Sequence, residues 1–372
     1  MFRFPFLSNT GSARPPVRPC GLYHKYVRKI IRSRRFLPLM LAAALLFPSL
    51  PAFADEEKTS ETGFFLDTVI TITLYGDTDS AAMDGCFDLL NEYEQMLSRT
   101  IEGSDVWNVN HSGGEPTEVS EETAYLIETA LYYSELSDGA FDITITPLVE
   151  LWDVQNKASQ VSGDETTEEA LASGLIPSDE AIEEALSHID YTVVSCEGTT
   201  VTLSDPEAEI DLGGIAKGYI ADCLEEYLLS QGIESALINL GGNVQTVGTK
   251  PDGSSWKIGI QKPFGGSSDI ITVVECTGES VVTSGTYERY FEIDGTIYHH
   301  ILDPNTGYPT DNGLVSVTIL ADSSTICDAL STTCFVLGLE DGMELIESIE
   351  DVEALFITDD GTMYRTGGFP ED

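Results

Sequence analysis

Positive charge is scarce in this sequence. Its 372 residues include 18 Lys and Arg against 63 Asp and Glu, a formal net charge of −45. Nine of the cations precede residue 55, where no acidic residue occurs, so residues 55–372 hold nine cations and a formal charge of −54. A field of that sign repels the phosphates of nucleic acids and anionic membrane surfaces. The composition therefore excludes nucleic acid as a partner and leaves membrane contact only to the N-terminal segment.

Long hydrophobic runs are also scarce. The longest, FLPLMLAAALLFPSLPAFA at residues 36–54, follows the basic N-terminus and ends on Ala52-Phe53-Ala54. This order is typical of a secretory signal, and the run is short and proline-interrupted for a bilayer span. We expect residues 1–54 to be a signal peptide, with an uncleaved anchor as the alternative. Residues 55–63 then form a linker, residues 64–372 form the folded domain, and the protein is exported to the cell envelope or a periplasm-like compartment.

Cysteine pairs with metal-ligand spacing are missing. Six of the seven cysteines follow the N-terminal segment, and none belongs to a CxxC motif. Scattered thiols of this kind are typical of buried small hydrophobic residues. Export would permit disulfides, but the spacing does not assign any pairing.

A regular alternation of strands and helices is missing as well. Alternating residues 65–75 predict a half-buried strand, and residues 100–120 and 153–178 read as a loop and an acidic surface excursion. Further strands are expected between residues 192 and 320 and near residue 355. Because these segments do not form a βαβ repeat, the sequence predicts an α+β fold. The clearest helical patterns cover Ser80 to Leu97, Glu121 to Leu136, a segment ending near Ser230, and Ser324 to Leu337.

The stretch DLGGIAKGYIAD, Asp211 to Asp222, places glycines and a rare lysine where a strand runs into a helix. Backbone N–H groups at a helix start bind phosphate, and Lys217 would add a positive charge. The stretch lacks the spacing of a Walker A loop. A tight strand-to-helix turn and an anion site both remain open on this pattern.

Asp328 and Thr332 lie four residues apart at the start of the late helix and so share a face. A carboxylate and a hydroxyl in this arrangement suit Mg²⁺, which takes few protein oxygens and keeps phosphate or water. The alternative is that Asp328 only stabilises the helix N-terminus while Thr332 packs.

Two further stretches carry candidate residues. His299 and His300 precede the turn DPNTG, and because neighbouring strand residues point to opposite faces, they do not ligate one metal together. One of them could be a general base, or an ordinary half-buried histidine. Asp142, in GAFD, reads on its own as a turn residue.

Five stretches in this order closely resemble the ApbE family of FAD:protein FMN transferases: GAFDITITPLVELW, DLGGIAKGYIAD, TSGTYERYF, HHILDPNTGYP and CDALSTTCFVLG. The resemblance extends from residue 65 to the C-terminal strand. It implies a two-lobed α+β unit with mixed or antiparallel sheets, flanking helices and an FAD site between the lobes. It also implies Mg²⁺, FAD as substrate, release of AMP, and FMN joined by a phosphoester to Thr or Ser of an exported redox subunit or FMN-binding domain.

The resemblance assigns roles to individual residues. Asp328, Thr332 and the backbone carbonyl of Gly214 match the metal ligands, and Asp328 and His300 match the catalytic positions, with His300 as candidate acid or base. Leu66 stands where the family often has methionine beside the flavin. The other positions that match contacts to FAD are Ala140, Phe141, Asp142, Lys217, His300 and Ile301.

The expected function is therefore a Mg²⁺-dependent FAD:protein FMN transferase. Two alternatives remain: an FAD pyrophosphatase that gives FMN and AMP at the same site, and an exported flavin-binding protein without turnover.

Overall fold

The structure is a computed structural model that describes residues 58–76, 80–161, 163, 165–266 and 268–370. The predicted signal segment, residues 1–54, lies outside the described residues. No helix within these ranges is long and apolar enough to cross a membrane.

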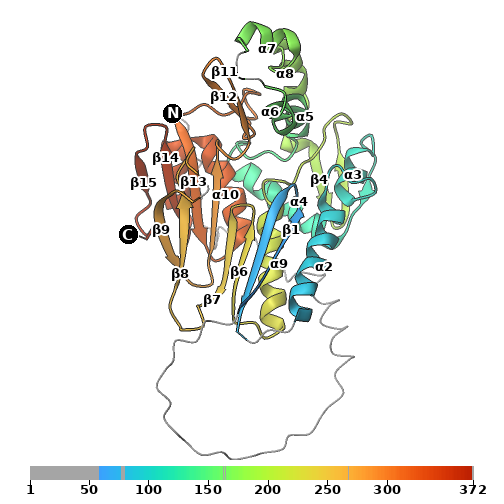
Figure 1. The fold of residues 1–372 in the computed structure, drawn as a ribbon. Coiled ribbons are helices and arrows are strands. Elements are labelled where there is room, and N and C mark those ends of the chain that lie inside the picture. The colour runs from blue at the N-terminus through green and yellow to red at the C-terminus, as the bar shows by residue number, and fades with distance from the viewer. Residues whose placement is uncertain (1–57, 77–79, 162, 164, 267, 371–372) are drawn as a thin grey trace, which may run out of the picture.

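An eight-stranded sheet forms the centre of the molecule, and every neighbouring pair in it is antiparallel. In Figure 1 the strands of this sheet fill the left and centre of the main body, with α9 and α2 to their right. In spatial order its strands are β1 (Lys58–Phe65), β2 (Thr68–Tyr75), β6 (Ser235–Leu240), β7 (Asn243–Gly248), β10 (Ser280–Gly285), β13 (Leu314–Ala321), β14 (Glu353–Thr358) and β15 (Met363–Arg365).

Helices cover one face of this sheet. Apolar residues of α2, α9, α10 and α11 pack with Ile70, Val282 and Val317 of the strands in one continuous core. Together, the sheet, these helices and the elements packed on them form the main lobe (Figure 1). Its helices are α2 (Ser80–Leu97), α3 (Asp105–Asn110), α4 (Glu121–Leu136), α9 (Ala216–Ser230), α10 (Ser324–Leu337) and α11 (Leu339–Glu347).

A two-stranded hairpin, β8 (Trp256–Gln261) and β9 (Ile270–Cys276), covers the opposite face of the sheet. Its apolar residues pack with Val281 and Leu320, the strand neighbours of Val282 and Ile319. Since successive strand residues point to opposite faces, this alternation gives the sheet one core on each side.

The other elements form a small three-stranded sheet and a second lobe. The small sheet joins β3 (Thr117–Glu118), β5 (Thr200–Leu203) and β4 (Val194–Glu197), which follows a short 3₁₀ turn at Tyr191–Val193. The small lobe has its own apolar core around Trp152. It comprises α5 (Thr146–Trp152), α6 (Val154–Ala158), α7 (Thr167–Ser173), α8 (Asp179–Leu186), β11 (Tyr290–Ile293) and β12 (Thr296–His299).

The α+β prediction is confirmed, and the helices predicted at residues 80–97, 121–136 and 324–337 are present with those bounds. The linker predicted over residues 55–63 is wrong for residues 58–63, which form most of β1. Hydroxyl pairs, Ser60 with Thr73 and Thr62 with Thr71, hold this polar edge strand on β2. A half-exposed edge strand does not need the apolar alternation that the prediction required.

Two loops predicted from polar composition are also wrong. Residues 100–120 contain α3 and β3, and residues 153–178 contain α6 and α7. Val154, Ala170 and Ile176 are buried in the small-lobe core. Glu168 and Glu169 on α7 are exposed while Ala170 beside them is buried, so the acidic composition concealed a short amphipathic pattern.

Candidate functional site

Asp328 on α10 is the point where several predicted site residues meet. Its side chain is only 3% exposed. Oδ2 accepts a hydrogen bond from the backbone N–H of Gly218 at 2.8 Å, and Oδ1 lies 3.3 Å from Nζ of Lys217. Both partners lie in the first turn of α9, where the helix dipole favours an anion. The anion that the glycine-rich turn holds is therefore a carboxylate of the protein itself.

The glycines of this turn permit close approach. A Cβ on Gly218 would lie 2.2 Å from the carbonyl oxygen of Ser324 on α10, which is an impossible contact. A Cβ on Gly214 would lie 3.0 Å from the ring of Phe141 and 3.9 Å from Oγ1 of Thr332. Neither glycine has a positive φ. Packing of α9 on α10, and of the turn on Phe141, is what requires glycine here.

The oxygen atoms at this point suit a hard divalent cation. Nζ of Lys217 already lies between the carbonyl oxygen of Gly213, at 3.1 Å, and Asp328. The half-buried hydroxyl of Thr332 has no hydrogen-bond partner among the residues that the structure describes. A carboxylate, an unsatisfied hydroxyl and a backbone carbonyl of Gly214 form the kind of donor set that Mg²⁺ prefers. The predicted metal ligands Gly214, Asp328 and Thr332 thus fit that ion.

The predicted flavin-contacting segment at residues 140–142 is nearly buried throughout, with exposures of 6%, 5% and 9%. Oδ1 of Asp142 accepts hydrogen bonds from the backbone and hydroxyl of Thr144, and Oδ2 accepts one from the N–H of Tyr191. Burial raises the pKa of Asp142, while these bonds oppose the rise. Asp142 therefore holds a turn, as read from its local sequence, and Phe141 is the residue that reaches Gly214.

The two histidines have different environments. His299 is buried, and its Nε2 donates to the carbonyl of Thr310 at 2.9 Å. His300 is half-buried, and its Nδ1 lies 3.3 Å from the carbonyl of Arg289, to which it donates. Burial, aided by the charge of Arg289, lowers the pKa of His300 to about 3. His300 is therefore neutral at physiological pH, with the lone pair of Nε2 available to accept a proton.

The last two predicted contacts lie at the edges of this region. The side chain of Ile301 is buried in the main core, so only its backbone can face a ligand. Leu66 and Asp67 form the tight β1–β2 turn, both with positive φ, and the N–H of Leu66 donates to Glu94. The carbonyl of Asp67 lies 3.5 Å from Nη2 of Arg289, which brings this turn beside the TSGTYER segment.

Sequence reasoning missed Glu288, which lies within TSGTYER. The side chain is exposed, yet surrounding protein desolvates the carboxyl and raises its pKa to about 7, against the charges of Lys217 and Arg289. An accessible but desolvated carboxylate beside two cations is typical of a reactive site. The signal in the sequence was the carboxylate next to Arg289 in an otherwise aromatic and hydroxyl-rich stretch.

A second missed contact involves Arg99. Its Nε lies 3.0 Å from Asp211 and its Nη1 lies 2.8 Å from Glu150. Oδ1 of Asp211 also accepts from the N–H of Gly213. Arg99 therefore fixes the start of the glycine-rich turn, and its partner 112 positions away was not predictable from local pattern.

The chain is similar to proteins of a known family. A sequence profile described as the ApbE family matches residues 66–356. A protein of Klebsiella pneumoniae (strain 342) named FAD:protein FMN transferase is 40% identical over 306 residues, which cover 82% of this chain and 90% of that protein.

Solved structures give the same result. The ApbE protein of Thermotoga maritima superimposes with a TM-score of 0.74 at 34% identity, covering 85% of this chain and all of that one. The flavin transferase ApbE of Vibrio cholerae gives a TM-score of 0.72 at 30% identity, with 84% and 98% coverage. The chain that forms this site belongs to the ApbE family.

Proposed function

We propose that this protein is a Mg²⁺-dependent FAD:protein FMN transferase that acts outside the cytoplasm. It joins FMN through a phosphoester to a Thr or Ser hydroxyl of an exported protein and releases AMP. The observation that carries the proposal is the buried carboxylate of Asp328, held by Lys217 and the N–H of Gly218, with Thr332 one turn further along α10.

The coarser part of this function follows from the family. The chain is a flavin transferase that uses FAD, as are relatives named FAD:protein FMN transferase that share 35–40% of their residues with it. Mg²⁺, the acceptor hydroxyl and AMP release are the parts that we propose.

The main physical difficulty is to admit the diphosphate of FAD into a domain whose residues 55–372 carry a formal charge of −54. Salt screens this charge beyond about 8–10 Å, so the local groups decide. Lys217 and Arg289 supply positive charge there, and Arg289 forms no ion pair with any carboxylate in the described part of the chain. When bound, Mg²⁺ would neutralise diphosphate charge and favour cleavage of the bond to AMP.

In the transfer, the acceptor oxygen bonds to the FMN phosphorus while the bond from that phosphorus to the AMP oxygen breaks. The hydroxyl proton passes to a base, and AMP leaves with the electron pair of the broken bond. His300 and Glu288 are the two bases that the structure offers. Lys217 and Arg289 stabilise the charge that develops on the phosphate oxygens, so catalysis is mainly positioning and electrostatics.

The acceptor that we propose is an exported redox subunit or FMN-binding domain, because the N-terminal segment reads as a signal peptide. Export and acceptor are tested together by one labelling assay. Purified protein is incubated with FAD, Mg²⁺ and the exported protein fraction of the source cell, and flavin fluorescence is measured in a denaturing gel.

Fluorescence on a protein band that requires both Mg²⁺ and FAD is the expected result. Asp328→Asn should abolish it, and Lys257→Met, which changes an exposed ion pair on the hairpin, should not. FMN release without any labelled band would identify a pyrophosphatase instead. Unchanged labelling by Asp328→Asn would contradict the site assignment.

A further inference from the structure

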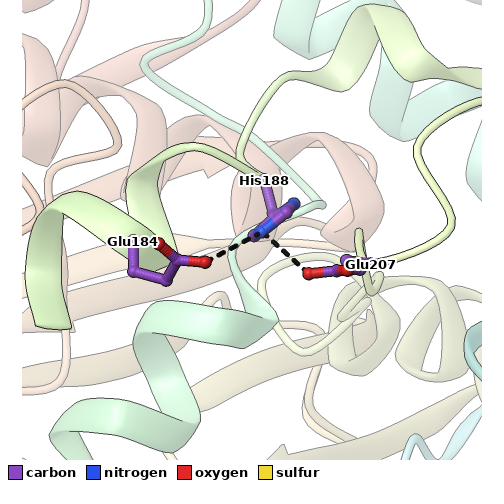
Figure 2. A group of neighbouring side chains, drawn as sticks. All are labelled: Glu184, His188 and Glu207. Carbon is purple, nitrogen blue, oxygen red and sulfur yellow. Dashed lines mark ion pairs between the residues drawn. The ribbon is translucent and has the colours of Figure 1, made fainter.

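His188 anchors a cluster of metal-binding side chains outside the flavin site. It lies just after the end of α8, and Figure 2 shows Glu184 and Glu207 on either side of its ring. Nε2 lies 3.2 Å from an oxygen of Glu207 and 4.0 Å from one of Glu184, while Nδ1 lies 2.8 Å from Oδ2 of Asp205. The donor atoms of Glu184, His188 and Glu207 all lie within 4.8 Å of one another.

The cluster joins the two lobes. Glu184 lies on α8 in the small lobe, and His188 lies four positions later, just beyond the end of that helix. Asp205 and Glu207 belong to the main-lobe segment that follows β5. Asp205 fixes this segment locally, because its Oδ1 accepts a hydrogen bond from the N–H of Glu207 at 3.0 Å.

The hydrogen bond to Asp205 orients the imidazole for metal binding. A carboxylate that accepts from Nδ1–H fixes the neutral ring in the tautomer whose lone pair is on Nε2. That lone pair then points toward Glu184 and Glu207 (Figure 2). A carboxylate behind the histidine also raises the basicity of the ligand nitrogen, as at known zinc sites.

The spacing suits a tetrahedral ion. Zinc bonds of about 2.0–2.1 Å place neighbouring ligands roughly 3.3 Å apart. The observed 3.2 Å and 4.0 Å from Nε2 lie close to that value, and the side chains of Glu184 and Glu207, 80% and 71% exposed, are free to close the difference. An imidazole nitrogen favours zinc-class ions over Mg²⁺ or Ca²⁺.

The charge balance also favours a cation. Three carboxylates, those of Asp205, Glu207 and Glu184, lie within 4.0 Å of the ring nitrogens of His188. No lysine or arginine of the described ranges forms an ion pair with these three. With a neutral imidazole, three negative charges would lie together uncompensated.

We propose that Glu184, His188 and Glu207 bind a divalent ion of the zinc class, with Asp205 orienting His188, and that this ion fastens the small lobe to the main lobe. The segment that carries Glu207 continues directly into Asp211 and the glycine-rich turn. The ion therefore stabilises the start of the turn that holds Asp328, without contacting the substrate. This proposal is independent of the flavin chemistry.

Zinc binding to the purified full chain tests the proposal. Metal-stripped protein competes with a chromophoric chelator for Zn²⁺, in the Asp328→Asn background so that the flavin site does not contribute. We expect one Zn²⁺ equivalent in this background and its loss, at least a tenfold weakening, in His188→Ala and in the double variant Glu184→Gln/Glu207→Gln. Asp205→Asn should weaken binding roughly 10–100-fold.

Matched control variants distinguish Zn²⁺ binding at this cluster from non-specific binding to the acidic surface. Glu183→Gln removes the same charge from an exposed neighbour on α8, and His111→Ala removes an exposed histidine from the main lobe; both should keep the equivalent. Zn²⁺ should also raise the Tm of the parent, the Asp328→Asn protein, but not the Tm of the double variant made in it. Because Glu184 and Glu207 are mostly exposed, we expect the double variant to fold. It therefore tests the proposal even if His188→Ala does not fold.

Equal Zn²⁺ binding by the parent and the double variant would overturn the proposal. So would binding of Ca²⁺ or Mg²⁺ as tight as that of Zn²⁺, since an acidic surface without an imidazole ligand behaves that way. Absence of any Zn²⁺ equivalent in the parent would leave the cluster as a protonated His188 paired with carboxylates, and the proposal would fail.

Discussion

Asp222 and Asp328 cap each other's helices. Asp222 on α9 accepts hydrogen bonds from the N–H groups of Ser324 and Thr325 at the start of α10, at 2.6 and 3.0 Å. Asp328 on α10 accepts one from the N–H of Gly218 at the start of α9. Each helix therefore supplies the anion that satisfies the other's N-terminus. The pair fixes the angle and distance at which the proposed metal ligand meets the glycine-rich turn.

This exchange of caps requires the two helices to touch, so Gly218→Ala should destabilise the protein. A Cβ there would lie 2.2 Å from a backbone oxygen and 2.8 Å from Cβ of Asp328, and neither can move without shifting a helix. We expect a loss of about 2–4 kcal/mol in the free energy of unfolding, measured by urea denaturation. Gly367→Ala, where a Cβ meets nothing within 4 Å, should change it by less than about 0.5 kcal/mol. Equal stability of the two variants would contradict the close packing.

The ammonium group of Lys217 lies beside Asp328, where we propose that Mg²⁺ also binds. The ammonium lies 3.3 Å from Asp328, whose side chain is 4% exposed. Removing it in Lys217→Met should tighten Mg²⁺ binding roughly tenfold, because the ion no longer competes with an ammonium. The same change should lower kcat/KM for FAD about 100-fold, because the charge on the phosphates loses a partner.

Calorimetric Mg²⁺ titration and steady-state kinetics measure the two effects separately. Lys257→Met is the matched control, since it removes an exposed lysine whose ion pair lies on the hairpin. A variant that binds Mg²⁺ more weakly would show that Lys217 supports the metal rather than competes with it.

The identity of the base is decided by pH. Glu288 has a pKa of about 7, raised by desolvation from the surrounding protein, and must be deprotonated to accept a proton. If it is the base, kcat/KM rises with pH and levels off above about 7, and Glu288→Gln abolishes that limb and about 99% of the activity. His300→Ala would then lower kcat/KM but keep its rise with pH.

His300 gives a different profile. Its pKa is about 3, lowered by burial, so it is unprotonated across the range from pH 5 to 9. A flat profile over this range in the parent and in Glu288→Gln, with activity lost in His300→Ala, would assign the base to His300. In that case the charge of bound FAD raises its basicity at the moment of transfer.

Much of this site was predictable because its parts are local. Residues four apart on one helix gave Asp328 and Thr332, and the strand-to-helix pattern gave the turn with Lys217. The predicted helix at residues 324–337 matches α10, and the hydroxyl of Ser323 accepts from the N–H of Ile326 at its start.

The rest depends on contacts between distant segments. Gly218 and Asp328 are 110 positions apart, and His188 meets Asp205 across two lobes. The pKa of Glu288 is a property of the protein around it, and no residue pattern encodes it. Residues 58–63 and 153–178 were misread because short, half-exposed elements need little apolar sequence.

Glu225 gives a stability test of the same helix. It lies one turn after Asp222 on α9, and burial, with repulsion from Asp222, raises its pKa to about 8. The unfolded value is 4.5, so the folded state binds the proton more tightly. The stabilisation is complete below about pH 4.5 and is lost as pH rises to about 8. Above pH 8 the folded state carries the desolvated charge.

Glu225→Gln should therefore raise the free energy of unfolding at pH 8.5 by about 1–3 kcal/mol, a discounted figure because the side chain is only half-buried. The gain should vanish near pH 4.5, and the hydrogen bond with Nε2 of Gln245 should pass to the new amide oxygen. Urea denaturation at both pH values measures the effect, with Glu347→Gln on the exposed end of α11 as the control. A Glu225→Gln gain that is equal at both pH values would show that folding does not raise the pKa of Glu225, and a loss at pH 8.5 would show that the charged carboxylate stabilises the folded protein.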